Sequence, residues 1–593
     1  MISEFGQNAL QVLQSRYLLR DEKGRTIETP MQLFRRVAKA IARAELNYGQ
    51  TDVGKTEDEF FKIMSELEFL PNTPTLMNAG TKVGQLSACF VVPVEDSLAG
   101  IFEAAKSTAL IHQTGGGTGF SFSKLRPRGD FIKSPDGRAS GPITFMTVFD
   151  RTTEVVKQGG KRRGANMGIL RADHPDILNF IQCKSNKGFL SNFNISVAAT
   201  DKFMESARKN QSYDLINPRT SAITQRLNAK NVFETIAHNA WKSGDPGLIF
   251  IDEINRHNPT PQLGAIEATN PCGEMPLLYW ESCNLGSINL SKVIENKKIN
   301  WTKLKRLVTL GVRFLDDVID VNRYPISQIA KITKSNRKIG LGVMGFADAL
   351  IKMEIPYDSS KALLMAKKIM KFIEAEGHAE SQRLGVERGS FANFEQSIWK
   401  KRMHYTTMRN ATVTTIAPTG TISIIANCSS GIEPLFAVSY IRNVMDGTRL
   451  LEVNQYFEKI AKQQEFYSKK LMGEIARHGS IGNIKSIPRK IRKLFVTAHE
   501  ISPFWHIRMQ AAFQKYTDNA VSKTINLAHN AGQKEVRDAF WLAYRLKCKG
   551  ITVYRYGSKE NQVLSFGQKA RQGTRTIVDA EFSGGCIETV CPH

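Results

Sequence analysis

Cysteine is scarce in this chain: eight cysteines are spread at irregular intervals over 593 residues. That number excludes the dense disulfide framework of a small secreted protein, so we expect reduced thiols whose pairing, where it occurs, is catalytic. Three of them, Cys183, Cys428 and Cys548, lie in apolar or mixed helix-like contexts and are interpreted as packing residues. Five thiols are left to explain.

Long apolar runs are also missing. No segment approaches the roughly 18 uninterrupted apolar residues that a membrane span needs. The first residues lack the basic leader and apolar stretch of a secretory signal. With 41% hydrophobic and 23% charged residues, the composition is that of a large soluble enzyme. We therefore expect a cytoplasmic protein without a membrane partner.

Acidic residues are fewer than basic ones: the chain has 56 Asp and Glu and 81 Lys and Arg, which gives a net charge of +25. The surplus is scattered over short runs such as 161–163 and 489–493. Such a field attracts polyanions, and a basic nucleic-acid-binding protein is one alternative, for which duplex binding would depend steeply on salt. Scattered runs are more typical of a solvated surface. We expect nucleotides, not nucleic acid, as partners.

Apolar periodicity divides the chain into three parts. Residues 33–41 and 60–69 have apolar positions at helical spacing and predict a helical domain over 1–70. From 71 to 560, β-rich runs alternate with helical ones, which predicts an α/β architecture, and the long continuous span favours a barrel. The β-rich runs are 88–94, 411–416 and 422–425; the helical ones include 304–321 and 498–516. Residues 561–593 predict a flexible C-terminal tail.

Two glycine motifs suggest phosphate binding at first sight. Residues 49–56 fit the phosphate-loop pattern, which would indicate a P-loop NTPase, but an amphipathic helix precedes them where that site needs a buried strand. We interpret them as a helix–helix loop with Thr56 as helix cap. Residues 340–345 fit the dinucleotide fingerprint, but the residues before them are polar and no ribose-binding acid follows. They are interpreted as a strand packed closely on a helix at 346–353.

No metal site is predicted. His499, Glu500 and His506 lack the spacing of a zinc protease helix. Cys586, Cys591 and the last residue, His593, would supply only half a zinc site. A redox pair is the favoured interpretation of the two tail cysteines.

The segment Asn270-Pro271-Cys272-Gly273-Glu274 places a thiol between an amide and a carboxylate on a turn shaped by proline and glycine. No histidine lies near Cys272 in sequence to activate it, and an adjacent carboxylate would raise its pKa, which disfavours a thiolate nucleophile. A sulfur radical needs no ionisation. Glu274 would then act as base on a substrate hydroxyl while Asn270 positions a neighbouring one.

With these residues, the chain resembles ribonucleotide reductase catalytic chains over nearly its whole length. Six further segments carry the resemblance in the same order: 72–77, 86–90, 114–120, 158–166, 282–285 and 417–423. The resemblance implies a ten-stranded α/β barrel with Cys272 on a central finger loop. In the family, a thiyl radical on this cysteine abstracts the ribose 3′-hydrogen, Glu274 takes the 3′-hydroxyl proton and Asn270 holds the ribose hydroxyls.

The resemblance also assigns the other thiols. Cys89 and Cys283 would help the 2′-hydroxyl leave as water from the opposite ribose face and close into a disulfide. Tail residues Cys586 and Cys591 would reduce that disulfide by exchange and be recharged by a thioredoxin-like partner. Four residues, 587–590, separate the tail pair, a wider spacing than in familiar relatives, which affects the expected pairing geometry.

Nucleotide contacts follow from the same resemblance. The substrate diphosphate is expected where 418–422 opens a helix, because free amides and the helix dipole favour anions; the same residues could also cap a helix without a ligand. The substrate-binding set is Thr73, Ala88, Gly117, Pro418, Thr419, Gly420, Thr421 and Ile422.

A deoxynucleotide or ATP effector at the interface of a homodimer is expected on Asp96, Arg126, Ile132 and Lys133, although Asp96 could instead cap the helix after it. The loop linking effector to substrate is Gln158, Gly159, Gly160, Lys161, Arg162, Arg163, Gly164, Ala165 and Asn166.

The radical source separates the classes of the family. Large subunits that receive a radical from a metal-bearing partner carry adjacent tyrosines, whereas Tyr554 and Tyr556 are separated here by Arg555. With 112–117 and 411–420, this segment resembles the class II enzymes, in which adenosylcobalamin generates the radical. We therefore predict a ribonucleoside-diphosphate reductase dependent on adenosylcobalamin. A class I large subunit that needs a separate metal-radical subunit is the alternative. The chain begins directly at the helical domain, so we expect no ATP-cone module.

Overall fold

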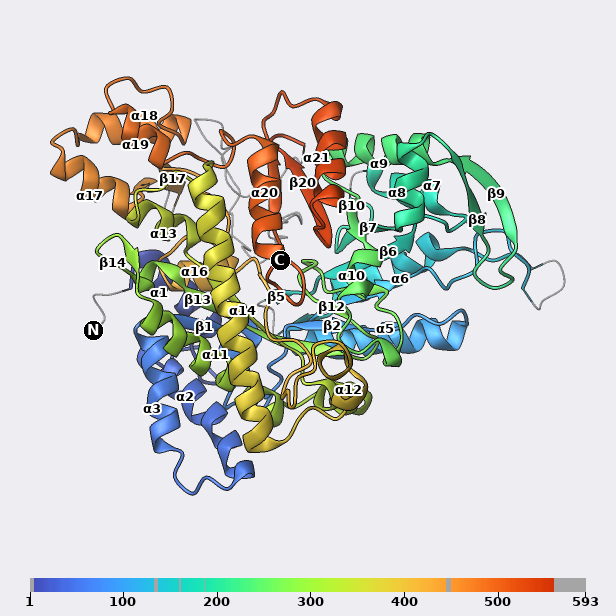
Figure 1. Cartoon of the computed structure of the whole chain (residues 1–593), viewed down its shortest axis with the longest axis horizontal. Coiled ribbons are helices and arrows are strands. Elements are labelled where there is room, and N and C mark those ends of the chain that lie inside the picture. The colour runs from blue at the N-terminus through green and yellow to red at the C-terminus, as the bar shows by residue number, and fades with distance from the viewer. Residues whose placement is uncertain (1–4, 133–136, 159–161, 187, 444–448, 559–593) are drawn as a thin grey trace.

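The computed structural model describes residues 5–132, 137–158, 162–186, 188–443 and 449–558. Its centre is a ten-stranded sheet with helices around it (Figure 1). The strands run in the order β1-β13-β2-β3-β6-β7-β10-β20-β19, and β16 pairs with the other edge of β13. Their bounds are β1 Phe69–Pro71, β2 Cys89–Val91, β3 Gly117–Ser121, β6 Asn166–Arg171, β7 Phe193–Ala199, β10 Gly247–Phe250, β13 Ser282–Asn289, β16 Ile339–Met344, β19 Thr524–Leu527 and β20 Gly550–Arg555.

Nine of the ten strands form two parallel halves that are joined antiparallel, and β1 pairs antiparallel with β13 outside both halves. Strands β2, β3, β6, β7 and β10 are parallel neighbours, and the half that contains β13, β16, β19 and β20 meets them antiparallel at β2–β13 and β10–β20. Two parallel bridges, Leu341 to Thr414 and Ile416 to Val521, connect β16 to the residues that lead into β19. The sheet therefore returns on itself, as the predicted α/β barrel requires.

Side chains alternate between the two faces of the strands. Cys89 and Val91 of β2 belong to the small apolar cluster inside the ring, whereas Phe90 between them packs outward against the helices. Cys283 of β13 also belongs to the inner cluster. The strand pattern thus directs both thiols to the interior.

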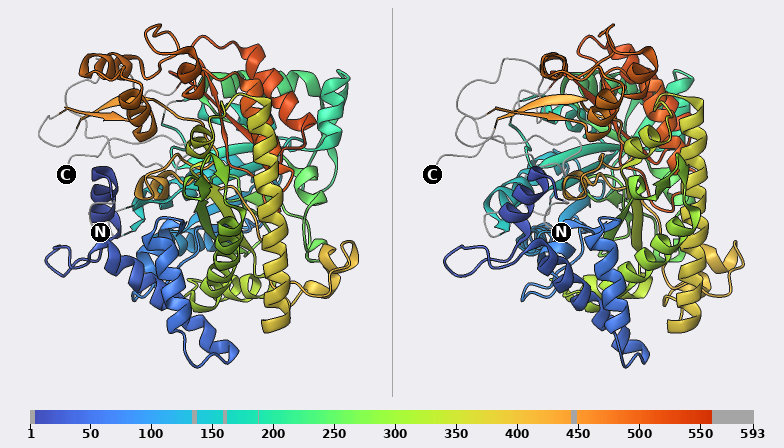
Figure 2. Two further views of the ribbon diagram at one scale, coloured as in Figure 1. Left: turned by 60° about the vertical axis from the view of Figure 1, so that its left-hand side comes forward. Right: turned by 90° about the vertical axis from the view of Figure 1, so that its left-hand side faces the viewer.

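Two groups of helices cover the outside, and the long α14 crosses one flank (Figures 1 and 2). The helices are α4 Thr73–Asn78, α5 Leu98–Gln113, α6 Pro142–Val155, α7 Ile177–Gln182, α8 Asp201–Arg208, α9 Ala229–Ser243, α10 Ile251–Arg256, α11 Trp301–Val321, α12 Ser327–Asn336, α13 Phe346–Lys352, α14 Ser360–Arg388, α15 Ile398–Lys401, α16 Gly420–Ile425, α17 Gln455–Gln463, α18 Lys469–His478, α19 Arg489–Leu494, α20 Pro503–Gln514 and α21 Gln533–Arg545. Short two-stranded sheets are β4 Lys157–Gln158 with β5 Arg162–Arg163, β8 Ser212–Ile216 with β9 Ile223–Asn228, β11 Ala268–Thr269 with β12 Pro276–Leu277, β14 Ile294–Glu295 with β15 Lys298–Ile299, and β17 Ser439–Asn443 with β18 Arg449–Val453. No helix among the described residues is long and apolar enough to cross a membrane.

The N-terminal helices lie at one end of the molecule, shown in blue in Figure 2. They are α1 Gln7–Val12, α2 Pro30–Ala42 and α3 Gly54–Ser65, with a π-turn at Leu13–Tyr17 and a 3₁₀ turn at Arg43–Tyr48. A capping box between Thr29 and Gln32 starts α2, with Pro30 in its first turn. Apolar side chains of these helices share one core with β13, α11 and α14.

Buried charge strengthens that contact. Glu45, fully buried, accepts an ion pair from Arg388 of α14 at 2.7 Å, and Arg313 of α11 binds the same carboxylate. The rings of Phe60 and Phe314 meet edge to face, with centroids 5.0 Å apart. The N-terminal helices are therefore joined to the barrel by apolar and charged contacts together.

The phosphate-loop pattern at 49–56 lies between two helices, as predicted, and no strand enters it. The predicted capping by Thr56 is wrong, because α3 already begins at Gly54. The Asp52 carboxylate accepts a hydrogen bond from the Gly54 amide at 2.8 Å and turns the chain two residues earlier.

The predicted helices at 304–321 and 498–516 correspond to α11 and α20, and 88–94 contains β2. The run 422–425 was expected to be β-rich, and this expectation is wrong because it forms the end of α16. Ile422 and Ile425, three residues apart, are both buried on one side of this short helix. Packing therefore overrides the β preference of isoleucine.

Candidate active site

A hairpin made of β11 and β12 carries Cys272 at its tip. Asn270 closes the turn with two hydrogen bonds to Met275. Its backbone amide donates to the Met275 carbonyl at 3.2 Å, and its side-chain oxygen accepts from the Met275 backbone amide at 2.9 Å. Gly273 has a φ of +81°, a conformation that favours glycine. Cys272 is half-buried, whereas Asn270 and Glu274 beside it are buried.

The glycines of β3 make room for this hairpin. A Cβ atom on Gly119 would lie 1.7 Å from the Thr269 carbonyl oxygen, and one on Gly117 would lie 3.0 Å from Cγ of Pro271. On the neighbouring β7, the Asn194 side chain donates to the Pro271 carbonyl at 3.0 Å. The glycine-rich segment 114–120 therefore forms a slot that fixes the position of the hairpin.

Cys89 and Cys283 are opposite each other in the antiparallel pairing of β2 with β13. Both are buried free thiols. The side-chain amide of Asn270 donates to Sγ of Cys89 at 3.2 Å. The structure thus brings the predicted catalytic residues of the hairpin next to the predicted reducing pair.

Burial raises the pKa of Cys89 well above its ordinary value, and the Glu274 carboxylate raises it further, while the hydrogen bond from Asn270 opposes both. Burial also raises the pKa of Cys283, against the lowering effect of the Lys338 ammonium. Both residues are therefore protonated thiols at neutral pH. A buried pair of thiols is suited to donating hydrogen and closing into a disulfide, and poorly suited to acting as free thiolates.

Two segments outside the hairpin hold Glu274 by its backbone. Its carbonyl oxygen accepts from the Ala520 amide and from Oγ1 of Thr415, each at 2.9 Å. Neither Thr415 nor Asn194 is assigned an individual role from the sequence. Thr415 lies within 411–420, one of the segments that resemble class II enzymes, whereas Asn194 lies in none of the segments that carry the resemblance.

The predicted substrate residues are distributed around the same region. Ala88 donates its amide to the Cys283 carbonyl at 3.0 Å, and the Gly117 amide donates to Ala88 at 2.8 Å, so both border the thiol pair. Thr73, at the start of α4, has its hydroxyl 2.7 Å from that of Tyr17.

Residues 418–422 open α16, as predicted. Thr419 precedes the helix with a φ of +57°, and its hydroxyl accepts from the Gly431 amide at 2.6 Å. It therefore does not cap the helix with its side chain. Within the described part of the chain, the first amides of α16 receive no side-chain cap.

Two of the residues predicted for the effector site, Asp96 and Arg126, contact each other: the Asp96 carboxylate lies 2.9 Å from Nε of Arg126. The cap of α5 is Ser97, whose hydroxyl accepts from the Gly100 amide, so the alternative role of Asp96 as cap is not realised. Ile132 is 40% exposed. Lys133 lies outside the described residues.

The predicted linking loop 158–166 starts at the last residue of β4 and contains β5, its pairing partner, and residues 159–161 between the two strands lie outside the described residues. Its last residue, Asn166, accepts from Oγ1 of Thr118 at 2.7 Å, which connects the loop to β3. Tyr554 lies in β20 and pairs in register with Asn526. The tail residues Cys586 and Cys591 are also outside the described part of the chain.

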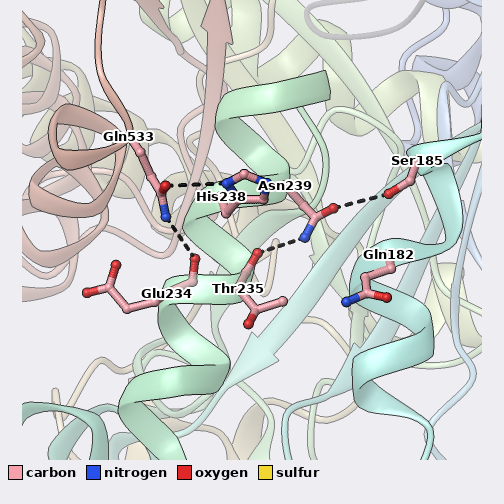
Figure 3. A pocket seen from close by; sticks show the side chains of 7 residues that line it. All are labelled: Gln182, Ser185, Glu234, Thr235, His238, Asn239 and Gln533. Atoms are coloured by element: carbon pink, nitrogen blue, oxygen red, sulfur yellow. Dashed lines mark hydrogen bonds between the residues drawn. The ribbon is translucent and has the colours of Figure 1, made fainter.

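A polar hollow of about 410 Å³ lies elsewhere, between α7, α9 and α21 (Figure 3). Its lining residues are Gln182, Ser185, Glu234, Thr235, His238, Asn239 and Gln533. None of them belongs to the residues around Cys272. Among the described residues, no cluster of His, Cys, Asp and Glu suits a metal ion.

Comparisons with known proteins show which family the sequence matches. Residues 87–554 match the family "Ribonucleotide reductase, barrel domain", and residues 3–84 match "Ribonucleotide reductase, all-alpha domain". A protein of Thermoplasma acidophilum named "Vitamin B12-dependent ribonucleoside-diphosphate reductase" is 52% identical over 94% of this chain and 80% of its own length. A protein of the same name from Mycobacterium tuberculosis is 46% identical over 98% of this chain and 82% of its own.

More distant relatives include a "Ribonucleoside-diphosphate reductase subunit alpha" of Chlamydia pneumoniae, 29% identical over 98% of this chain and 61% of its own length. Among solved structures, the "Actinobacillus ureae class Id ribonucleotide reductase alpha subunit" superimposes with a TM-score of 0.76 over 93% of this chain and 97% of its own, at 23% identity. That likeness is one of fold.

Proposed function

Because the chain belongs to the ribonucleotide reductase family, we propose that it reduces ribonucleoside diphosphates to deoxyribonucleotides with a radical derived from adenosylcobalamin. The names of the relatives at 46–52% identity support this class, whereas the "subunit alpha" relative is only 29% identical. The observation that carries the proposal is the position of Cys272, on a hairpin tip beside Asn270 and the opposed thiols Cys89 and Cys283.

The residues present fit a radical source bound beside the hairpin. Cys272 is half-buried, and Cys89 and Cys283 are buried, so the hairpin tip is the thiol that a separate group can approach. Adenosylcobalamin, when bound, supplies a radical by homolysis of its cobalt–carbon bond.

Cys272, as a thiyl radical, removes the 3′-hydrogen of the ribose. The Glu274 carboxylate takes the 3′-hydroxyl proton, and the Asn270 amide orients the hydroxyls. Cys89 and Cys283 then supply two hydrogens, are oxidised to a disulfide, and the 2′-hydroxyl leaves as water. The 3′-hydrogen returns from Cys272, so each turnover consumes two thiol hydrogens and regenerates the radical.

The regeneration of the thiol pair requires a reductant. We assign this role to Cys586 and Cys591, followed by a thioredoxin-like protein, because exchange between dithiols and disulfides is the only chemistry needed. We place the protein in the cytoplasm, a reducing compartment, because its eight cysteines are too few and too irregularly spaced for a disulfide framework.

A homodimer with an effector site between its chains is part of the proposal. Leu98 and Phe102 of α5 are 65% and 54% exposed, and Val155 at the end of α6 is 80% exposed. Large exposed apolar side chains on packed helices indicate a surface for a partner. Asp96 lies just before α5 and Arg126 lies after β3, so an effector bound to them would be at the edge of this surface.

Anaerobic turnover tests the function. The purified chain should form deoxynucleotide from a ribonucleoside diphosphate with adenosylcobalamin and dithiothreitol, and Cys272→Ser should form none. Product that appears only after addition of a metal-loaded second protein would instead establish the class I alternative.

A further inference from the structure

The backbone of Glu274 is held by residues that the mechanism does not use. Its carbonyl oxygen accepts two hydrogen bonds of 2.9 Å, from the hydroxyl of Thr415 and from the amide of Ala520. Thr415 is fully buried. It lies in the extended segment that bridges β16 and the residues before β19. The two halves of the barrel therefore both fix the hairpin. The half that contains β3 provides the glycine slot, and the half that contains β16 holds Glu274.

The glycines of β16 explain how Thr415 reaches this position. A Cβ on Gly342 would lie 2.4 Å from the Thr415 carbonyl oxygen, and one on Gly340 would lie 2.7 Å from its Cγ2. Leu341, between them, donates to the Val413 carbonyl at 2.7 Å and accepts from the Thr415 amide at 3.0 Å. The pattern at 340–345, which fits a dinucleotide fingerprint, thus serves a close approach of two backbones.

A buried polar group fixes the other end of the same segment. The Asp518 carboxylate accepts from the amides of Val413 and Thr414 at 2.8 and 3.2 Å and pairs with Nε2 of His378 at 3.0 Å. The Lys549 ammonium donates to the Asn519 carbonyl at 2.6 Å. Both donors to Glu274 therefore stand on segments that cannot shift without breaking buried hydrogen bonds.

We propose that Thr415 is a positioning residue for Glu274. The Thr415 hydroxyl sets the position of Glu274, the proposed base, relative to Cys272, the proposed radical site two residues earlier. This inference rests on the proposed function, in which Glu274 receives a proton. A base must lie within hydrogen-bond distance of the proton that it takes, and a displacement of about 1 Å can cost about 100-fold in rate. Substrate binding, which uses other residues, is affected much less.

The test compares three substitutions at one position. Thr415→Val and Thr415→Ala both remove the donor to Glu274, and Thr415→Ser keeps it. We expect kcat to fall about 10-fold or more in the first two variants with KM within about twofold of the parent, and Thr415→Ser to recover most of kcat. A shared defect of the valine and alanine variants shows that the lost hydroxyl matters, because their effects on packing differ.

Thr414→Val is the matched neighbour control. Its hydroxyl accepts from the Asp518 amide at 2.9 Å and does not contact Glu274. We expect this variant to lower the melting temperature and leave kcat within about twofold of the parent. Equal kcat losses in the Thr414 and Thr415 variants would reduce Thr415 to a structural role and overturn the inference.

The two possible failures are distinguishable. An unsubstituted chain that forms no deoxynucleotide under the conditions given above contradicts the proposed function itself. A parent enzyme that turns over, with Thr415→Val and Thr415→Ala equally active, contradicts only the positioning role.

Discussion

Cys89 and Cys283 are direct partners in the antiparallel pairing of β2 and β13. Opposed residues in such a pair have Cα atoms roughly 4.5–5.5 Å apart, which lies inside the range that a disulfide spans. The two sulfurs can therefore join and separate while both strands keep their hydrogen bonds. A reducing pair on a rigid sheet can cycle without rearranging the site around Cys272.

The first prediction concerns this pair. One round of reaction without an added reductant should leave a Cys89–Cys283 disulfide, detectable by peptide mapping, in a Cys586→Ser, Cys591→Ser variant whose tail cannot take over the disulfide by exchange. Cys89→Ser and Cys283→Ser should each lose turnover by about 10³-fold or more, because no partner is left to donate the second hydrogen. A mapped disulfide that includes Cys272 would contradict this assignment.

The second prediction concerns the glycine slot. In Gly119→Ala the added methyl would meet the Thr269 carbonyl at 1.7 Å, so the hairpin must move. We expect kcat to fall about 100-fold through displacement of Cys272. Gly473→Ala in α18, where a Cβ has open space, is the control and should keep full activity. Unchanged kcat in Gly119→Ala would show that the hairpin tolerates displacement.

The third prediction concerns the ion pair behind Cys283. Lys338 and Glu281 are both 1% exposed in their side chains and lie 2.6 Å apart. Removing one partner leaves a buried charge, so Lys338→Met should lower the free energy of unfolding by about 3–5 kcal/mol. The double variant Lys338→Met with Glu281→Met should recover a large part of it, as urea unfolding would measure. A double variant less stable than the single one would refute this account.

The fourth prediction concerns pH. Burial raises the pKa of Asp348, at the start of α13, to about 6. The folded state therefore keeps a proton that the unfolded chain, with a pKa of 3.8, has released. Stability from this group is fully present below about pH 4 and is lost as the pH rises through 6.

Asp348→Asn removes this titration and keeps an acceptor for the Ser429 amide. We expect the variant to be more stable than the parent by about 3 kcal/mol at pH 7 and by almost nothing at pH 4. Urea unfolding at several pH values in this interval gives the difference. A stability difference independent of pH would show that Asp348 does not titrate here.

The sequence predicts the helices with strong periodicity, such as α11, and the residues that form the hairpin around Cys272. These features depend on local patterns of apolar spacing and turn residues. The helical end of α16 at Ile422 was missed because isoleucine prefers strands where packing does not decide.

Contacts between distant segments leave no comparable signal. Thr415 meets Glu274, and Asn194 meets Pro271, only because the ring of strands brings them together. The glycine pattern at 340–345 fits a dinucleotide-binding loop as well as a strand that packs closely on its neighbours. The close approach of Thr415 to Gly340 and Gly342 shows that the glycines serve close packing.

The buried pairing of Glu45 with Arg388 bears on how this protein can be divided. The two family matches suggest that the chain could be cut between residues 84 and 87. A fragment that starts at 87 would retain Arg313 and Arg388 without the Glu45 carboxylate that both of them bind, and would expose the face of Phe314 that Phe60 covers. We therefore expect the N-terminal helices to lose their structure together with the part of the barrel that they cover, and not to behave as a module that can be exchanged.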